Sequence, residues 1–455
     1  MVDARPAAHG APDPGGPRAA SGGSDGLQRA FARIAGWGRP RAFLGILGSC
    51  ALVAFLASAL LGPELPLRHD GPAYHEGAVN ILAGRGYIQH WRSLDKVSPA
   101  ATELRAFFPV GYSAFLAGVY AFTEPRPMAA VVANAVLLAL SGVLVYGVGR
   151  RVAGEGVGRV ASVAFVLMSL TTRMSQTVYP EPLFMTLVLG CLWAATCWCS
   201  WPAQVVAGLL LGMAHLVRTN SLAMPFVLFV AFVLLRERWG RAAARALVVG
   251  GVSLVVVAPW TLRNWQRFGR FVAVATNGGF NLWMGNNPKS SGTYQWPEFP
   301  PDVVDARDEA EWDQRLTRHA MAFIRSRPGL FLARMPVKLS HAIGFGMVGE
   351  DAVRNEGPVR VVGRLALSVM LAVLLVIAVV QAGWAVGRLM RQRSLAAGWA
   401  LIPMLFILLF AGFVMVFHGC RRFLYPAYPF IALSCAIAGA WFLEWRRGQR
   451  MRGAS

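Results

Sequence analysis

Long apolar runs alternate with short basic segments along most of this chain. A run of about 20 apolar residues is long enough to cross the hydrocarbon core of a bilayer as a helix. The pattern predicts ten spans, at about residues 43–62, 127–149, 160–177, 182–200, 202–217, 220–236, 242–260, 363–386, 396–417 and 423–444. The chain is therefore expected to be an all-α polytopic membrane protein.

The arginines give these spans an orientation. Basic clusters occur at residues 29–41, 150–159, 236–245, 388–393 and 446–452. Cytoplasmic loops collect Lys and Arg, so all five clusters are placed inside, and both termini are expected in the cytoplasm. The apolar segment 107–122 is then interpreted as a helix at the outer face, because an eleventh crossing would move Arg150 and Arg151 outside.

The spans divide the chain into four parts. Residues 1–42 are rich in Ala, Gly, Pro and Arg and predict a disordered cytoplasmic tail. Residues 43–260 form the transmembrane core, with a first outer loop at 63–126, and residues 261–362 form a second outer loop. Residues 363–455 contain the last spans and a basic cytoplasmic tail. The inner loops are short and basic, so function is expected in the two outer segments.

The second outer segment contains a predicted amphipathic helix. Trp312, Leu316, Phe323 and Ile324 lie on one stripe, acids come early and bases late, and Arg-Pro-Gly at 327–329 ends the pattern.

Composition supports a membrane protein and narrows its partners. Hydrophobic residues make up 55% of the chain and charged residues 15%, against about 25% in soluble domains. A net charge of +21 would attract nucleic acid or anionic lipid, and the hydropathy favours membrane lipids, so no nucleic-acid partner is predicted. The six cysteines fall mostly in apolar runs and predict no disulfide framework.

An unusual polar stretch follows the first apolar run, "LPLRHDGPAYHEGAVNILAGRGY" at residues 65–87. Gly71 and Pro72 suit a helix start, and the glycines at 84–86 suit its end. Asp70 is then expected directly ahead of a helix that lies on the outer leaflet, at the level of lipid phosphates. The same letters also fit Asp70 as a helix cap, with the nearby His69, His75 and Glu76 as solvated surface residues.

The order of these parts resembles the first outer loop of GT-C superfamily membrane glycosyltransferases. The closer resemblance is to the branch of protein O-mannosyltransferases and lipid A aminoarabinose transferases. Four later stretches are similar to motifs of that branch: "YPEPLF" at 179–184, "GLLLGMAHLVRTNSL" at 208–222, "PWTLRNWQRFGRFVAVATNGGFNLWMGNNP" at 259–288 and "RRFLYPAYP" at 421–429. The chain departs from the pattern at Gly71, where many relatives carry Glu, so a second acid would have to come from Glu76, Glu181 or elsewhere.

This resemblance implies a GT-C fold and a sugar transferred from a polyprenyl-phosphate-linked donor to an envelope acceptor. The reaction would occur at the outer face of the cytoplasmic (inner) membrane. Phosphate leaves without protonation when its charge is met, so one carboxylate base is sufficient, and Asp70 is predicted to act as that base with inversion. Glu76 and Glu181 are the predicted supporting acids, although Glu181 could equally stabilise a helix N-terminus.

Several cations fall on the outer face, against the usual inside bias. The guanidinium group of arginine donates paired hydrogen bonds to phosphate. The predicted lipid-phosphate ligands are therefore Arg218, Arg263, Lys338, Arg421 and Arg422. Snorkelling to lipid headgroups would explain the same positions. The predicted sugar or acceptor contacts are His69, Tyr74, Asn277 and Asn286, although a tight turn explains the letters around Asn277 as well.

No cofactor is predicted. No Asp-x-Asp pair that could hold a divalent metal occurs in the first outer loop, and no nucleotide-binding loop is present. The rival interpretations are a transporter or flippase of a polyprenyl-linked glycan, and a noncatalytic lipid-binding assembly protein. The sequence leaves both the sugar and the acceptor (lipid, glycan or protein) open.

Overall fold

The structure is a computed structural model that describes residues 48, 67, 69–91, 103–170, 174–198, 200–345 and 358–452. The predicted tail at 1–42, and the predicted first span at 43–62 apart from Gly48, lie outside the described residues. Within the described residues the chain is helical, with only two isolated β-bridges and no strand, which confirms the all-α prediction.

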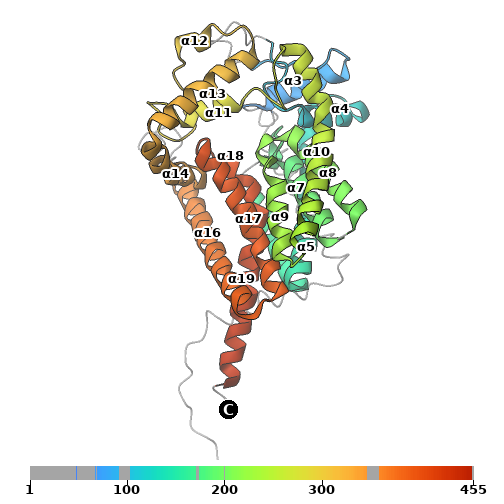
Figure 1. Ribbon diagram of the computed structural model, residues 1–455, viewed down its shortest axis with the longest axis vertical. Coiled ribbons are helices and arrows are strands. Elements are labelled where there is room, and N and C mark those ends of the chain that lie inside the picture. Colours follow the sequence, from blue (N-terminus) through green and yellow to red (C-terminus); the bar gives the residue numbers. More distant parts are fainter. Residues whose placement is uncertain are drawn as a thin grey trace, which may run out of the picture.

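In the described part of the chain, nine helices form the body of the molecule (Figure 1). They are α5 (Pro127–Ala153), α6 (Glu155–Leu170), α7 (Glu181–Cys197), α8 (Trp201–Val217), α9 (Met224–Leu234), α10 (Trp239–Phe268), α16 (Pro358–Gln392), α17 (Leu395–Val416) and α19 (Tyr428–Arg452). Most consecutive members are joined by short connections and run antiparallel, as short loops require.

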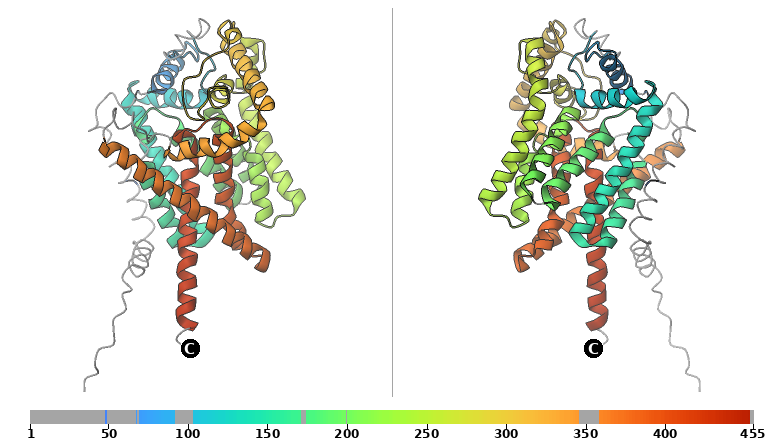
Figure 2. Two further views of the ribbon diagram at one scale, coloured as in Figure 1. Left: turned by 90° about the vertical axis from the view of Figure 1, so that its left-hand side faces the viewer. Right: turned by 90° about the vertical axis from the view of Figure 1, so that its right-hand side faces the viewer.

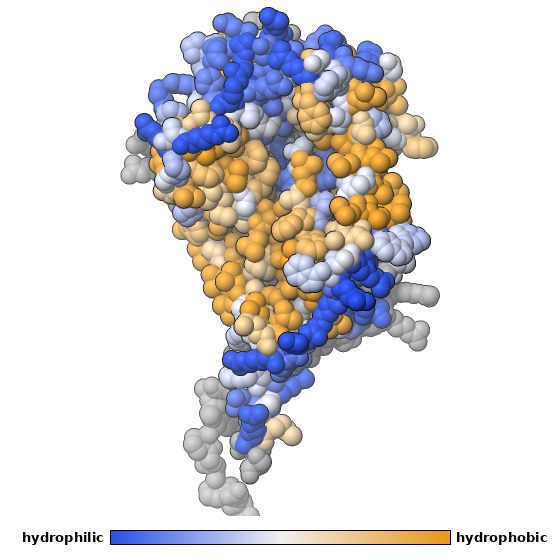
Figure 3. All heavy atoms as spheres, viewed as in Figure 1, coloured by the Kyte–Doolittle hydropathy of each residue, from blue (hydrophilic) through white to orange (hydrophobic). Residues whose placement is uncertain are grey.

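The apolar helices identify a multi-pass membrane protein. In the described part of the chain five helical stretches are long and apolar enough to cross a bilayer: Pro127–Ala153, Trp239–Phe268, Val361–Gln392, Leu395–Val416 and Arg421–Gln449. Shorter apolar helices occupy Val110–Phe122, Glu181–Cys197, Trp201–Val217 and Thr219–Leu234. Figure 3 shows a broad hydrophobic belt between two hydrophilic ends of the molecule. The count of ten spans stays a prediction.

Further helices cover one end of this bundle (Figures 1 and 2). They are α3 (Gly71–Leu82), α4 (Val110–Phe122), α11 (Gly278–Gly285), α12 (Pro301–Val304), α13 (Glu309–Ser326), α14 (Pro328–Ile343) and α18 (Arg421–Leu424). Helix α4, predicted as an interfacial helix, lies across the end of the bundle and not along it (Figure 2).

Helix α13 follows the amphipathic pattern of its sequence. Trp312, Leu316 and Phe323 are buried, and the Asp308 carboxylate caps the first turn by accepting a hydrogen bond of 2.8 Å from the Glu311 N–H. Helix α13 packs closely on α11 because Gly279 has no side chain: a Cβ there would lie 2.1 Å from the Asp313 carbonyl oxygen.

Candidate active site

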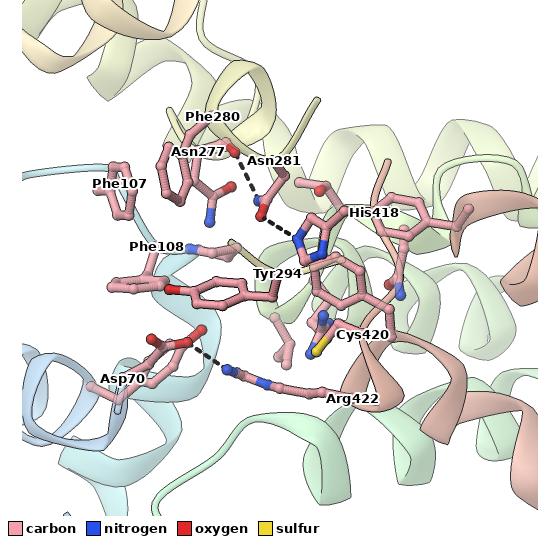
Figure 4. A pocket seen from close by; sticks show the side chains of 18 of the residues that line it. Asp70, Phe107, Phe108, Asn277, Phe280, Asn281, Tyr294, His418, Cys420 and Arg422 are labelled. Atoms are coloured by element: carbon pink, nitrogen blue, oxygen red, sulfur yellow. Dashed lines mark hydrogen bonds and ion pairs between the residues drawn. The ribbon is translucent and has the colours of Figure 1, made fainter. Parts of the chain in front are cut away.

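Asp70 and Arg422 meet at the covered end of the bundle. Asp70 directly precedes α3, and Arg422 lies in α18, 352 positions later. The Arg422 Nη1 donates a hydrogen bond to Asp70 Oδ2 and forms an ion pair with it (Figure 4). Asp70 occupies the N-cap position of α3, but its side chain makes no capping hydrogen bond to the helix.

Glu181 links this pair to a second arginine. Glu181 is fully buried at the start of α7, and its Oε1 accepts hydrogen bonds from both Arg422 Nε and Arg218 Nη1. The Glu181 Oε2 has no partner in the described part of the chain. Two carboxylates and two guanidinium groups therefore form one connected cluster with balanced charge. Such a cluster compensates charges that would be costly to bury singly.

Each arginine of this cluster also lies over an aromatic ring. The Arg422 guanidinium lies 4.2 Å from the Tyr179 ring centroid, and that of Arg218 lies 5.2 Å from the Phe423 ring centroid. Cation–π contacts of this kind orient a guanidinium without neutralising it.

A pocket with a volume of about 110 Å³ opens beside the cluster. It is lined by Asp70, Tyr74, Trp91, Phe107, Phe108, Pro109, Val217, Arg218, Thr219, Asn220, Asn277, Phe280, Asn281, Tyr294, Phe413, His418, Cys420, Arg422 and Phe423. These residues come from both segments that were predicted to lie outside, from the end of α8 and the turn after it, and from α17, α18 and the connection between them. The pocket thus depends on segments that are distant in sequence.

The two ends of the pocket differ in chemistry (Figure 4). Asp70 and Arg422 lie at one end, and Asn277, Asn281 and His418 lie at the other, with the Tyr294 ring between them. The Asn281 Nδ2 donates to the Asn277 carbonyl oxygen at 2.8 Å, and Asn281 Oδ1 lies 3.3 Å from His418 Nε2. One end is therefore charged and the other is neutral and polar.

Tyr74 forms part of the aromatic wall near Asp70. Its ring packs against Phe108 at 5.0 Å and edge-on against Tyr112 at 5.4 Å between centroids. Burial raises the pKa of the Tyr74 phenol above its usual value, so the hydroxyl remains protonated.

The structure separates the predicted phosphate ligands into two groups. Arg218 and Arg422 line the pocket, whereas Arg263 and Arg421 do not. The Arg263 Nη1 donates to the Arg105 carbonyl oxygen at 2.9 Å and to Asn264 Oδ1 at 3.0 Å. The Arg421 Nη2 donates to the Ile343 carbonyl oxygen at 3.0 Å and to the Ser368 hydroxyl at 2.9 Å.

Lys338 and Asn286 also lie outside the pocket lining, and they bind each other. The buried Lys338 Nζ donates to Asn286 Oδ1 at 2.8 Å and to the Val416 carbonyl oxygen at 3.1 Å, while Asn286 Nδ2 donates to that carbonyl oxygen at 2.9 Å. Burial and the nearby Arg334 lower the pKa of Lys338 to about 8. The pair connects α14, the end of α11 and the end of α17.

His69 and Glu76 lie away from the pocket as well. His69 is exposed and has a left-handed backbone, with φ of 53°, in the turn before α3. Glu76 accepts a hydrogen bond of 2.8 Å from the His90 N–H and forms an ion pair with the His90 ring.

The sequence did not identify most of the aromatic and amide residues that line the pocket. Asn220 lies within the "RTNSL" motif and Phe280 and Asn281 within "NGGFN", so these motifs carried a signal. Trp91, Tyr294 and His418 stand outside the quoted motifs, and nothing in their spacing distinguishes them from packing residues.

No group of three or more His, Cys, Asp or Glu side chains that could hold a metal ion occurs among the described residues. The four cysteines that can be described, Cys191, Cys197, Cys420 and Cys435, are free thiols.

Comparisons with known proteins give structural similarity only. No model of a protein family and no curated protein matches the chain. The fold and pocket define a polytopic helical membrane protein with a charged site at one end of its bundle. Among solved structures, the chain is similar to the oligosaccharyltransferase AglB from Archaeoglobus fulgidus in complex with an inhibitory peptide and a dolichol-phosphate, at 13% identity and a TM-score of 0.49. That match covers 90% of this chain, which spans about half (51%) of the archaeal protein.

A second solved structure is similar over a larger share of its own length. ArnT from Cupriavidus metallidurans bound to undecaprenyl phosphate matches with 15% identity and a TM-score of 0.41, covering 88% of this chain and 79% of that protein. At these identities and scores, the matches do not by themselves assign an activity.

Proposed function

We propose that this protein is a GT-C-type membrane glycosyltransferase. It moves a sugar from a polyprenyl-phosphate-linked donor to an acceptor in the cell envelope, at the outer face of the cytoplasmic membrane. The observation that supports this most strongly is the contact between Asp70 and Arg422, which joins a carboxylate and a guanidinium from distant segments in one pocket above an apolar helix bundle. A carboxylate base and a phosphate-binding cation are the two groups that this reaction needs.

Arg218 and Arg422 are the groups best placed to bind the donor phosphate. Both line the pocket, both carry a guanidinium group that can bind phosphate, and both are held by the buried Glu181. An arriving phosphate would compete with Asp70 for the Arg422 guanidinium. This exchange frees the Asp70 carboxylate at the moment when the donor occupies the site.

The lipid part of the donor has an apolar surface available next to the pocket. A groove of about 640 Å³ lies between α8, α9 and α10, with lining residues such as Leu222, Phe226, Leu247 and Leu254. Leu222 directly follows the turn whose residues Arg218 to Asn220 line the polar pocket. An isoprenyl chain in the groove would therefore have its phosphate close to the two arginines.

The reaction is a single displacement. Asp70 takes the proton of the acceptor hydroxyl or amine, whose lone pair forms the bond to the anomeric carbon. The bond between that carbon and the phosphate oxygen breaks, its electron pair stays on the phosphate, and the configuration inverts. Arg218 and Arg422 stabilise the charge that develops on the leaving phosphate. We propose no metal in this step.

The charge distribution supports the proposed outer-face location. The basic residues around 150, 236–245 and 388–393 lie at connections opposite to the helix ends that line the pocket. The inside preference of Lys and Arg then orients the pocket outward.

Asp70→Asn tests the proposal. The variant keeps the shape of the side chain and removes the base, so turnover is expected to fall by about two to four orders of magnitude while the protein still folds. The assay incubates radiolabelled polyprenyl-phosphate sugars with membranes that contain the protein and follows label in a new acceptor. Glu76→Gln is the matched control, because Glu76 lies outside the pocket, and it should retain parental turnover. Near-parental transfer by Asp70→Asn would refute the role of Asp70, and movement of intact labelled lipid without transfer would indicate a transporter.

A further inference from the structure

Two buried polar side chains on the pocket wall have unused hydrogen-bonding atoms. Asn220 is 6% exposed, and neither its Nδ2 nor its Oδ1 has a hydrogen-bond partner in the described part of the chain. His418 is 1% exposed, and its Nδ1 likewise has no partner among the described residues. An unmade hydrogen bond at a buried polar atom costs about 1–3 kcal/mol, so such atoms on a pocket wall are available to bind a ligand or water.

The backbone holds both side chains in defined places. Asn220 lies in the 3₁₀ turn η4 (Thr219–Ser221) between α8 and α9. The Ser221 hydroxyl fixes this turn, since it donates to the Arg218 carbonyl oxygen at 3.1 Å and lies 2.7 Å from His215 Nδ1.

The hydrogen bond of His418 determines which of its nitrogens can accept. The Asn281 Oδ1 accepts from His418 Nε2, because the Asn281 Nδ2 is already donated to the Asn277 carbonyl oxygen. In the neutral ring Nδ1 is then an acceptor. Burial lowers the pKa of His418 to about 3, and Lys338 and Arg218 act in the same direction, so the ring stays neutral at physiological pH.

No unpaired ionised group lines the pocket in the described part of the chain. Asp70, Arg218 and Arg422 are the only Asp, Glu, Lys or Arg side chains that line the pocket in the described part of the chain, and each is already in an ion pair. Asp70 and Arg422 lie at the end opposite to His418 (Figure 4).

Building on the proposed function, we infer that Asn220 and His418 bind the hydroxyl groups of a neutral sugar and select against sugars with an amino or carboxyl group. The Asn220 amide can both donate to and accept from hydroxyls, and His418 Nδ1 can accept from one. Near His418 an ammonium group would have no carboxylate, because Asp70 lies at the opposite end of the pocket (Figure 4). A carboxylate there would have to compete with Glu181 for Arg218. A charge left unpaired in a buried site is strongly disfavoured.

Binding of short synthetic donors to the purified full-length protein tests this inference. The probes are farnesyl phosphate diesters of glucose, mannose, galactose, glucuronic acid and a 4-amino-4-deoxypentose, with farnesyl methyl phosphate as a reference of equal phosphate charge. We expect at least one neutral hexose to bind about 10-fold more tightly than the methyl reference, as two or three added hydrogen bonds allow. The charged sugars should bind no more tightly than the reference. Tighter binding of the amino or uronic sugar than of every neutral hexose would overturn the inference.

Two variants at one position separate recognition from folding. We call the gain in affinity of the preferred hexose over farnesyl methyl phosphate the increment. Asn220→Ala should abolish the increment, because it removes only bonds to the sugar. The affinity for farnesyl methyl phosphate itself should stay within about twofold. Asn220→Asp adds a carboxylate without changing the shape and should raise the affinity for the amino sugar relative to the hexose. The matched control Asn80→Ala removes a buried asparagine that lines no part of the pocket, and it should keep the increment. Survival of the increment in Asn220→Ala would refute the inference.

The same titrations distinguish failure of the inference from failure of the proposed function. Arg422→Gln should weaken every probe, the methyl reference included, because it removes a phosphate-binding cation. If the reference binds equally to the parent and to Arg422→Gln, or binds to neither, the proposed function fails. If only the selection among sugars is absent, the proposed function stands and the inference fails.

Discussion

Two groups of charged residues at the covered end of the bundle use the same residue types differently. Around the pocket, Asp70 and Glu181 contact Arg218 and Arg422 directly through side chains. Away from it, the Glu309 Oε1 accepts hydrogen bonds from the Arg105 and Ala106 N–H groups at 2.9 and 2.7 Å, and Arg263 donates to the Arg105 carbonyl oxygen.

The difference lies in what each charge could exchange. A guanidinium that is paired with a carboxylate at a pocket wall can transfer its hydrogen bonds to a phosphate at little cost. A guanidinium or carboxylate that is bonded to backbone cannot leave without disrupting the loop that it supports. The first group is suited to ligand binding. The second stabilises the segment that continues into Phe107 and Phe108 on the pocket wall.

Of the substitutions in the two groups, Arg422→Gln should have the largest effect on turnover and stability. The change leaves two carboxylates without their shared cation and removes a proposed phosphate ligand. Turnover is expected to fall by about two to three orders of magnitude, and the free energy of unfolding by about 3–5 kcal/mol. Sugar-transfer assays and chemical denaturation in detergent measure the two effects. A variant with parental turnover would remove Arg422 from the phosphate site.

Glu309 should make the stability of the second group depend on pH. Burial raises the pKa of Glu309 from 4.5 to about 7, even though two backbone N–H groups and Arg263 act in the opposite direction. Between these values the unfolded chain loses a proton that the folded protein keeps. The free energy of unfolding should therefore fall as pH rises from about 4.5 to about 7, by about 3 kcal/mol in total.

Unfolding midpoints measured across that pH range test this expectation against Glu309→Gln. The glutamine cannot ionise, so its profile should be flatter than that of the parent. Superimposable profiles would show that Glu309 does not keep its proton in the folded state.

Arg263→Gln should have the smallest effect on turnover and stability, and it tests whether the second group only supports the fold. Loss of its bond to the Arg105 carbonyl oxygen is expected to lower the free energy of unfolding by about 1–2 kcal/mol while turnover stays within about threefold. The measurement pairs denaturation with sugar transfer. A large loss of lipid-phosphate affinity without loss of stability would return Arg263 to the set of phosphate ligands.

The sequence predicted the helices well where periodicity was strong. Helix α13 begins after Asp308 and ends before Pro328, as its acids, bases and apolar stripe indicated. The predicted third span at 160–177 was less accurate, because α6 begins at Glu155 and ends at Leu170, before the short turn at Met174–Gln176. Glu155 pairs with Arg159 one helical turn later, so polar residues that were assigned to a loop belong to the helix.

The candidate site was predictable only in part. Motif resemblance indicated that Asp70 and Arg422 would lie near each other, and they are in contact. Motifs could not distinguish Arg421 from Arg422, because neighbouring residues in a helix point about 100° apart and only one of the two faces the pocket. Nor could the sequence show that the amide of Asn220 is unpaired, since that depends on every segment around it.

Under the proposed function, the two arginines of the cluster have a kinetic consequence. A sugar-bearing lipid phosphate is a diester with one negative charge, whereas the lipid phosphate left after transfer is a monoester that gains further charge on losing its proton. Arg218 and Arg422 should therefore hold the spent carrier more tightly than the fresh one, and its departure into the bilayer would limit the steady-state rate.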